Sequence, residues 1–337
     1  MNKLVSVVIL CRNEVKYIKK TVEEVLKSEH SPLEVIIVDG MSNDGTREVL
    51  KELSNKYTNV RFVDNPEKLT PFAYNYGVKN SAGEYIQIIG ARNVLETGYI
   101  SNLVKTLESD ARIACAGGDY QHVFDTNVGK YISYAMESKF GVGAGNYRTM
   151  KESCFVDTVG VPMYPKRIFD ELGYFDERLT RNQDDDYNYR VTKANYKIFY
   201  NHNAKCTYMV RGSFKKLFTQ MSQYGYFKVF VNRKHKTLTT IRQIVPALFL
   251  LFLVLGFILG LLVHAFWTLY LAVIGLYMGL GIYSSMKANN NLTGTLLTFF
   301  ACFIMHVGYG YGYLKGIRDF LILGKVSPEG KMERQTT

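Results

Sequence analysis

The chain has 337 residues, 47% of them hydrophobic, and a formal net charge of +11 at pH 7. Hydrophobic content this high excludes global disorder, and the length suffices for two domains or for one large domain with an appendage. The sequence indicates neither a zinc site nor a disulfide framework, because none of the five cysteines forms a Cys-x-x-Cys pair: they are Cys11, Cys115, Cys154, Cys206 and Cys302.

Strands and helices alternate over the first 90 residues. Continuous apolar, often β-branched runs predict buried strands at residues 5–10, 33–38, 60–63 and 85–89. Helical spacing of apolar residues predicts helices at residues 14–26, 47–53 and 71–79. The first run lacks a small-residue cleavage site, so we interpret it as a strand and not as a signal peptide. This alternation favours a parallel, doubly wound sheet.

Polar residues follow three of these strands. In a doubly wound sheet, ligands bind beyond the carboxyl ends of the strands. Residues 11–14, 39–44 and 90–93 would therefore line one rim of the sheet. Asp39, which ends the second strand, is either a ligand contact or a turn-capping residue. Asp44 begins a helix, where capping explains it equally well.

A cluster of carboxylates closes this first part of the chain. Residues 182–190 are Asn-Gln-Asp-Asp-Asp-Tyr-Asn-Tyr-Arg, and the next acidic residue is Asp319. A solvated acidic loop and a catalytic cluster both fit this run. From Arg190 to Arg318 every charged residue is basic: Arg190, Lys193, Lys197, Lys205, Arg211, Lys215, Lys216, Lys228, Arg233, Lys234, Lys236, Arg242, Lys287, Lys315 and Arg318.

The basic stretch points to an anionic partner. Such a field attracts lipid headgroups, diphosphates or nucleic acid. No recognisable nucleic-acid-binding motif appears, and the apolar segments that follow favour lipid. We therefore expect chemistry on a phosphate-bearing substrate at a membrane surface, and no nucleic-acid partner.

The last third of the chain predicts a membrane anchor. Apolar and basic residues at helical spacing in residues 214–231 indicate an interfacial amphipathic helix. Residues 243–286 contain no Asp, Glu, Lys or Arg, enough for two spans of about 20 residues each. Basic residues flank this hairpin, and the positive-inside rule puts both of its ends in the cytosol.

A third uncharged stretch covers residues 288–314. If it spans, the basic tail lies outside, against the charge bias. A re-entrant or interfacial segment would avoid that conflict. We predict three spans, with two as the alternative.

Several motifs together resemble a known family. Val-Ser-Val-Val-Ile-Leu-Cys-Arg-Asn-Glu at residues 5–14 and Ile-Ile-Val-Asp-Gly-Met-Ser-Asn-Asp-Gly-Thr at residues 36–46 resemble the opening of family 2 glycosyltransferases with the GT-A fold. Further segments resemble the succinoglycan-type, ExoA-like branch of membrane-anchored enzymes of exopolysaccharide assembly: 71–77, 82–86, 140–148, 173–179, 181–190, 208–213 and 306–316. The ordered set covers nearly the whole chain.

The resemblance implies a fold, a set of domains and an activity. The fold is an α/β, Rossmann-like GT-A nucleotide-sugar domain followed by a C-terminal transmembrane helical region. We expect a cytosolic domain at residues 1–212, an amphipathic interface segment at 213–242, two or three membrane helices within 243–316, and a tail at 317–337. The activity is inverting transfer of a sugar from a nucleotide donor, expected to be UDP-linked, to a polyprenyl-linked saccharide or growing polysaccharide at the plasma membrane. A catalytically inactive membrane scaffold and a transporter are the rivals.

The resemblance also assigns donor-side residues. Asp39 matches the Asp that accepts a hydrogen bond from uracil, and Asn13, Glu14 and Asp44 lie where the family contacts the nucleotide. Gly90-Ala91-Arg92 stands where the family usually has Asp-x-Asp, which holds Mg²⁺ or Mn²⁺.

Neither carboxylate of that metal motif is present here. Either Arg92 supplies the positive charge directly, independently of metal, or catalysis is lost. Asn93 and Glu96 are candidate weak metal ligands.

On the acceptor side, Asp184 matches the family's general base, with Asp185 as the alternative. Gln183 replaces the usual neighbouring Glu. Arg190 and Arg211 are candidate contacts for a diphosphate or acceptor, and for Arg211 a lipid headgroup contact is an equal alternative.

Overall fold

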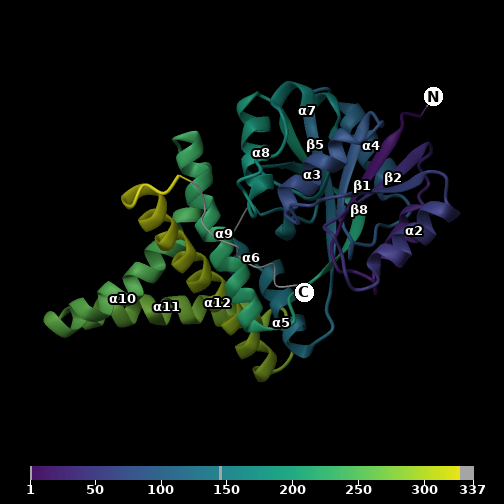
Figure 1. The fold of residues 1–337 in the computed structure, drawn as a ribbon. Coiled ribbons are helices and arrows are strands. Elements are labelled where there is room, and N and C mark those ends of the chain that lie inside the picture. Colours follow the sequence, from purple (N-terminus) through teal and green to yellow (C-terminus); the bar gives the residue numbers. More distant parts are fainter. Residues whose placement is uncertain (1, 144–145, 327–337) are drawn as a thin grey trace. The chain divides into compact units, whose positions relative to one another are not determined.

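The computed structural model describes residues 2–143 and 146–326. Contacts divide them into two compact units (Figure 1). We call residues 2–122 and 150–209 the N-terminal unit, and residues 123–143, 146–149 and 210–326 the helical unit. Each is described by itself.

The N-terminal unit is built on one eight-stranded sheet. The strand order is β3-β2-β1-β4-β7-β5-β8-β6. The bounds are β1 (Val5–Cys11), β2 (Leu33–Asp39), β3 (Val60–Asp64), β4 (Tyr85–Gly90), β5 (Ile113–Val123), β6 (Cys154–Val156), β7 (Gly160–Pro165) and β8 (Lys197–Met209). The first four strands in that order are parallel, and β7 runs antiparallel to both β4 and β5. The sheet is therefore mixed and not wholly parallel as expected, because the prediction rested on the first 90 residues alone.

The helices of this unit connect the strands. They are α1 (Ile18–Val25), α2 (Thr46–Lys56), α3 (Thr70–Lys79), α4 (Tyr99–Ser109), α7 (Arg167–Leu172) and α8 (Gln183–Lys193). β1 and β2 are buried over almost their whole length, which is why their sequences are continuous apolar runs. Helix α1 starts four residues later than predicted, because Asn13 adopts a left-handed backbone (φ 54°) and a turn follows it.

The carboxyl ends of the four parallel strands meet at one rim. The register pairs Cys11 with Asp39, Leu10 with Gly90 and Asp39 with Asp64. The polar residues that follow these strands consequently lie side by side, as the sequence predicted.

The cysteines carry no cross-link, and four of the five are buried. Burial raises the pKa of the Cys11, Cys115 and Cys206 thiols far above the ordinary value. Those thiols are packing groups and not nucleophiles.

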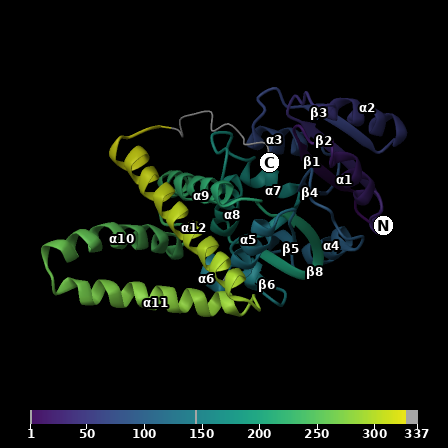
Figure 2. The same cartoon turned by 90° about the horizontal axis from the view of Figure 1, so that it is seen from below.

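The helical unit contains α5 (Asn127–Glu137), α6 (Lys139–Val142), α9 (Phe214–His235), α10 (Val245–Leu262), α11 (Phe266–Met286) and α12 (Leu292–Gly316), with α12 continuing as a π-helical turn over Ile317–Ile322. Among the described helices, three are long and apolar enough to cross a membrane: Ile241–Leu262, Phe266–Met286 and Leu292–Ile322. In both views α10 and α11 run side by side as a hairpin (Figure 2).

Residues 123–143, expected within the first domain, pack in this unit. The Ser138 hydroxyl lies 3.8 Å from the Cys302 sulfur of α12. His306 Nε2 lies 3.0 Å from the carbonyl oxygen of Phe140, and since a carbonyl only accepts, this nitrogen donates. Helices α5 and α6 thus form part of the helical unit's packing.

Candidate active site

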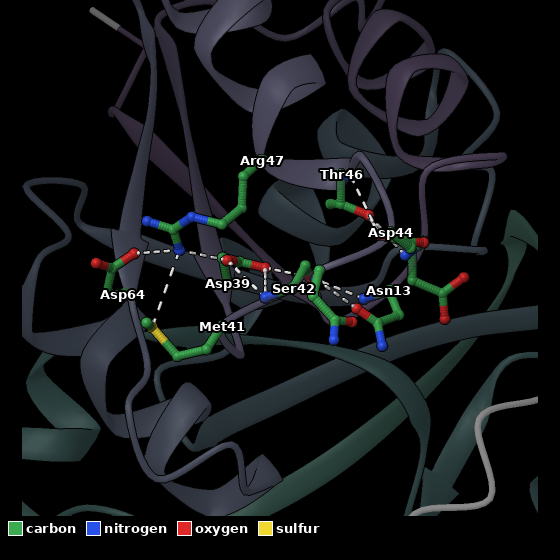
Figure 3. A network of polar contacts seen from close by, with 10 residues as sticks. Asn13, Asp39, Met41, Ser42, Asp44, Thr46, Arg47 and Asp64 are labelled. Carbon is green, nitrogen blue, oxygen red and sulfur yellow. Dashed lines mark hydrogen bonds and ion pairs between the residues drawn. The ribbon is translucent and has the colours of Figure 1, made fainter.

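Two loops at the rim are joined by hydroxyl groups. The Asn13 N–H donates to Ser42 Oγ (2.8 Å), and the Glu14 N–H donates to Thr46 Oγ1 (2.9 Å). Ser42 Oγ in turn donates to Asp39 (2.5 Å), as Thr46 Oγ1 does to Asp44 (2.5 Å). Figure 3 shows this network. It fixes the backbone after β1 against the turn that follows β2.

Asp44 stabilises the start of α2. Its carboxylate accepts from the Thr46 N–H (3.1 Å) and the Val15 N–H (3.3 Å). Although burial acts to raise its pKa, the hydrogen bonds from Thr46 and Val15 outweigh that effect and lower the pKa. Gly45 accommodates the left-handed N-cap conformation (φ 95°). Asp44 therefore has a capping role in the structure, and its contact with a donor stays a prediction.

Asp39 is fully enclosed at the centre of the rim. Besides Ser42, it accepts a hydrogen bond from Arg47 Nη1 at 2.6 Å. The same nitrogen lies 2.8 Å from Asp64 at the end of β3, so the guanidinium bridges two carboxylates (Figure 3). The Asp39 side chain is 0% exposed and that of Arg47 is 27% exposed. A nucleotide base could therefore hydrogen-bond to Asp39 only after the Arg47 side chain moved aside.

We expect Asp39→Asn to lower the free energy of unfolding by about 2–3 kcal/mol, since the amide removes a buried acceptor for a charged donor. The matched control is Asp64→Asn, whose carboxylate is 49% exposed and should cost at most about 1 kcal/mol. Denaturant unfolding of the purified chain measures both. Equal losses for the two variants would show that Asp39 is not the anchor of this network.

Arg92 lies at the same rim, held by two contacts. Its Nε donates to Glu14 Oε2 at 2.8 Å, and its guanidinium carbon lies 4.7 Å from the centre of the Tyr17 ring. Both partners belong to the segment that follows β1. The side chains of Arg92 and Glu14 are 20% and 16% exposed. A partly accessible cation therefore stands where the family motif would place carboxylates.

The residues around Arg92 do not fit a divalent cation. Asn93 Oδ1 accepts from the Gly90 N–H (2.9 Å), and Asn93 Nδ2 donates to the Thr207 carbonyl (2.8 Å), so this side chain joins the end of β4 to β8. Glu96 Oε1 accepts from Gln121 (3.3 Å). Within residues 2–143 and 146–326, no group of three or more His, Cys, Asp or Glu side chains could hold a metal ion. We derive no step through a metal.

The three consecutive aspartates form the first turn of α8. Asp185 accepts from the side chain of Asn182 (2.8 Å), and the buried Asp186 pairs with Arg190 (3.2 Å). Asp184 is exposed. Its Oδ1 accepts from the Asp185 N–H (2.9 Å), within the first turn of α8.

The topology places this turn at the rim end of the sheet. After α8 the chain enters β8 at Lys197, whose N–H donates to Arg112 just before β5 (2.8 Å). The start of β5 is at the end of the sheet away from the rim, because β5 runs in the same direction as β4. The first turn of α8 must then point the other way. Asn188 confirms this direction, since it donates to Thr158, just before the rim end of β7 (3.1 Å).

The two remaining candidates differ in position. Arg190 donates to the carbonyls of Leu172 (2.6 Å) and Tyr174 (2.7 Å), which fastens α8 to the loop before it. Arg211 lies in the helical unit, just before α9. The structure therefore brings together Asn13, Glu14, Asp39, Asp44, Arg92 and Asn93 at the strand ends, and does not relate Arg211 to them.

Arg47 and Asp64 are residues of this site that the sequence analysis missed. Arg47 could have been found from its position. It lies in the first turn of the helix that follows the strand ending in Asp39, so its side chain can reach back to the end of that strand.

Comparisons with known proteins support this description. The model of "Glycosyl transferase family 2" matches residues 6–173. The chain belongs to glycosyl transferase family 2. It is 27% identical over 327 residues to the succinoglycan biosynthesis protein ExoA of Rhizobium meliloti, covering 93% of this chain and 95% of that protein.

Two further similarities bear on this glycosyltransferase. It is 29% identical over 239 residues, covering 68% of this chain and 74% of the other, to a Methanococcus voltae protein named dolichyl N-acetyl-α-D-glucosaminyl phosphate 3-β-D-2,3-diacetamido-2,3-dideoxy-β-D-glucuronosyltransferase. The mannosyltransferase PcManGT of Pyrobaculum calidifontis, solved with GDP-Man and Mn²⁺, has the same fold: the TM-score is 0.64 at 14% identity, over 95% of this chain and 88% of that one. The chain is a nucleotide-sugar glycosyltransferase of glycan synthesis with a GT-A-like domain, and its three apolar helices suggest membrane association.

Proposed function

We propose that this enzyme is an inverting glycosyltransferase that moves one sugar from a UDP-sugar to a lipid-linked saccharide at the cytosolic face of the membrane. The observation that carries the proposal is the rim itself: an oriented carboxylate, Asp39, and an accessible guanidinium, Arg92, flank the carboxyl ends of β2 and β4. A uracil imide N–H can donate to Asp39 once the partly exposed Arg47 side chain moves off that carboxylate, and diphosphate oxygens can accept from Arg92.

Asp184 is the proposed general base. It removes the proton from the acceptor hydroxyl as that oxygen attacks the anomeric carbon. The new glycosidic bond forms on the face opposite the departing diphosphate, so the anomeric configuration inverts in a single displacement. The nucleoside diphosphate leaves with the bonding electron pair, and the proton remains on Asp184.

The negative charge that develops on the leaving diphosphate needs a counter-charge. Arg92 is the proposed source, because its guanidinium is always ionised and its planar fork suits phosphate oxygens. The bond between Arg92 Nε and Glu14, together with the Tyr17 ring, orients that fork before the donor arrives.

The acceptor is proposed to carry a polyprenyl phosphate or diphosphate. Two observations support this: the apolar helices that follow the GT-A-like domain, and the printed name of the Methanococcus voltae relative, which describes a dolichyl-phosphate-linked acceptor. The basic residues before α10 favour a cytosolic N-terminal unit by the positive-inside rule.

A nucleotide panel tests the donor half of this proposal. We expect UDP to raise the melting temperature of the purified protein by several degrees, and GDP, CDP and TDP to raise it less, because saturation at about 100 times the dissociation constant adds about 2.7 kcal/mol. Each nucleotide is measured in chelator and in Mn²⁺. The absence of any shift with UDP, under conditions where another nucleotide shifts, would reject the UDP assignment.

A further inference from the structure

Helix α12 packs along α9 for several turns, backbone against backbone. Three glycines one turn apart on α12 face α9: a Cβ at Gly312 would overlap the carbonyl oxygen of Ser222, and one at Gly308 or Gly316 would lie 3.1 Å or 2.9 Å from those of Phe218 and Tyr226. The partner positions advance in step with α12, so the two helices run parallel. Small residues at this spacing allow such close approach.

The C-terminal end of α12 stays on α9. The Tyr226 hydroxyl donates to the buried Asp319 (3.1 Å), which also contacts Arg318 and Lys325. Further along, the side chain of Arg233 donates to the Lys325 carbonyl. The end of the chain's last described segment therefore lies beside the end of α9, where α10 is about to begin.

Helix α12 meets the α10–α11 hairpin at the hairpin's base. Gly310 packs on the carbonyl of Pro246, in the first turn of α10. His306 and Phe303 contact Tyr277, about half-way along α11, and Phe299 packs on Gly281, closer to the end of that helix.

The distal part of the hairpin is packed differently. Its contacts join α10 to α11, with Phe252 on Tyr270 and Gly260 on Trp267. In both views the hairpin extends away from α12, which crosses at its base (Figures 1 and 2). Transmembrane helices usually cross at angles of about 20° to 40°, so we would expect a third spanning helix to contact the hairpin further along its length.

Burial separates α12 from the hairpin helices as well. We compared the most apolar stretch of 18 residues in each segment. Of these residues, 39% are buried in Leu292–Ile322, against 17% in Ile241–Leu262 and 6% in Phe266–Met286. Most residues of the hairpin helices are therefore not buried, whereas α12 is partly covered by neighbouring helices.

Helix α9 is too polar to span a bilayer beside α12. It is not among the described helices that are apolar enough to cross, and it carries Lys215, Lys216, Lys228, Arg233 and Lys234. Charged side chains in the hydrocarbon are costly. Because α12 is fastened to α9 along its C-terminal half, the two helices must share one environment.

We infer that the chain crosses the membrane twice, through α10 and α11, and that α9 and α12 lie together on the membrane surface. Their exposed basic side chains, which include Lys215, Lys216, Arg233 and Arg318, then face anionic lipid headgroups. The segment after α12 emerges on the same side as the N-terminal unit. This arrangement removes the charge conflict that a third span creates, because all flanking basic residues lie on one side.

Cysteine labelling of the full-length protein tests this topology. In a Cys154→Ser background, whose remaining cysteines are buried, we introduce Thr237→Cys, His264→Cys, Ala288→Cys and Val326→Cys at exposed positions. A membrane-impermeant maleimide is added to intact cells and to inverted membrane vesicles. We expect His264→Cys to be labelled only in intact cells, and the other three only in inverted vesicles.

A double variant, Ala288→Cys with Val326→Cys, supplies its own control. Residue 288 precedes α12 and lies on the same side as residue 237 whether α12 spans or not. Two labels in inverted vesicles are the expected result. One label in inverted vesicles and one in intact cells, with residue 326 reacting alongside residue 264, would show that α12 spans and would overturn the inference.

Discussion

Replacing Asp184 by Asn is expected to lower kcat by about 10²- to 10⁴-fold while nucleotide affinity stays unchanged. The amide keeps the size of the side chain but cannot accept the acceptor's proton. Asp184 lies in the first turn of α8 and not among the rim residues proposed to bind the nucleotide, so removing its charge should leave nucleotide binding intact. Sugar transfer to membrane lipid gives kcat, and titration with UDP gives the affinity.

Asp185→Asn is the matched control, in the same helical turn. Its carboxylate accepts from Asn182, so the loss should appear as a modest destabilisation and not as a loss of turnover. Near-normal turnover of the Asp184 variant would exclude its role as base. A large loss only in the Asp185 variant would transfer the role to the neighbouring residue.

Replacing Arg92 by Met is expected to lower turnover by about 10²- to 10³-fold, the usual cost of removing one preorganised group that stabilises transition-state charge. Arg92→Lys keeps the charge but loses the planar fork and the contact with the Tyr17 ring, so it should recover only part of the activity. Because no carboxylate replaces the missing metal motif, we expect the native enzyme to keep its activity in chelator.

Arg112→Met is the control for this substitution. Arg112 is 65% exposed, pairs with Asp110 on the surface and precedes β5 at the end of the sheet away from the rim, so its loss should leave turnover unchanged. If chelator abolished the native activity and Mn²⁺ restored it, the proposed role of Arg92 would be wrong.

Much of the N-terminal unit could be predicted because its signals are local. β1 and β2 are buried on both faces, which leaves a continuous apolar run in the sequence. The carboxyl ends of parallel strands share a rim, so Asp39 and the residues after Gly90 could be placed together without coordinates. The same reasoning missed the antiparallel β7, because its short run of Gly160–Pro165 carries no signal of direction.

The packing of the helical unit could not be predicted, since it depends on contacts between distant segments. The local sequence of α5 and α6 does not predict that Phe140 contacts His306 or that Ser138 contacts Cys302. The glycine-rich segment 306–316 was identified as part of the family resemblance, but its role as a close-packed face depends on Ser222 and Gly225 of α9 beside it. Arg47 was missed for a similar reason, because its two partners end different strands.

The most direct test of the central claim is a transfer assay with a radiolabelled UDP-sugar panel, in membranes that contain the native enzyme or its Asp184→Asn variant, with chelator present. We expect the native enzyme to move label from at least one UDP-sugar into the lipid fraction, and the variant to move almost none while still binding UDP. Equal transfer by both proteins would contradict the account.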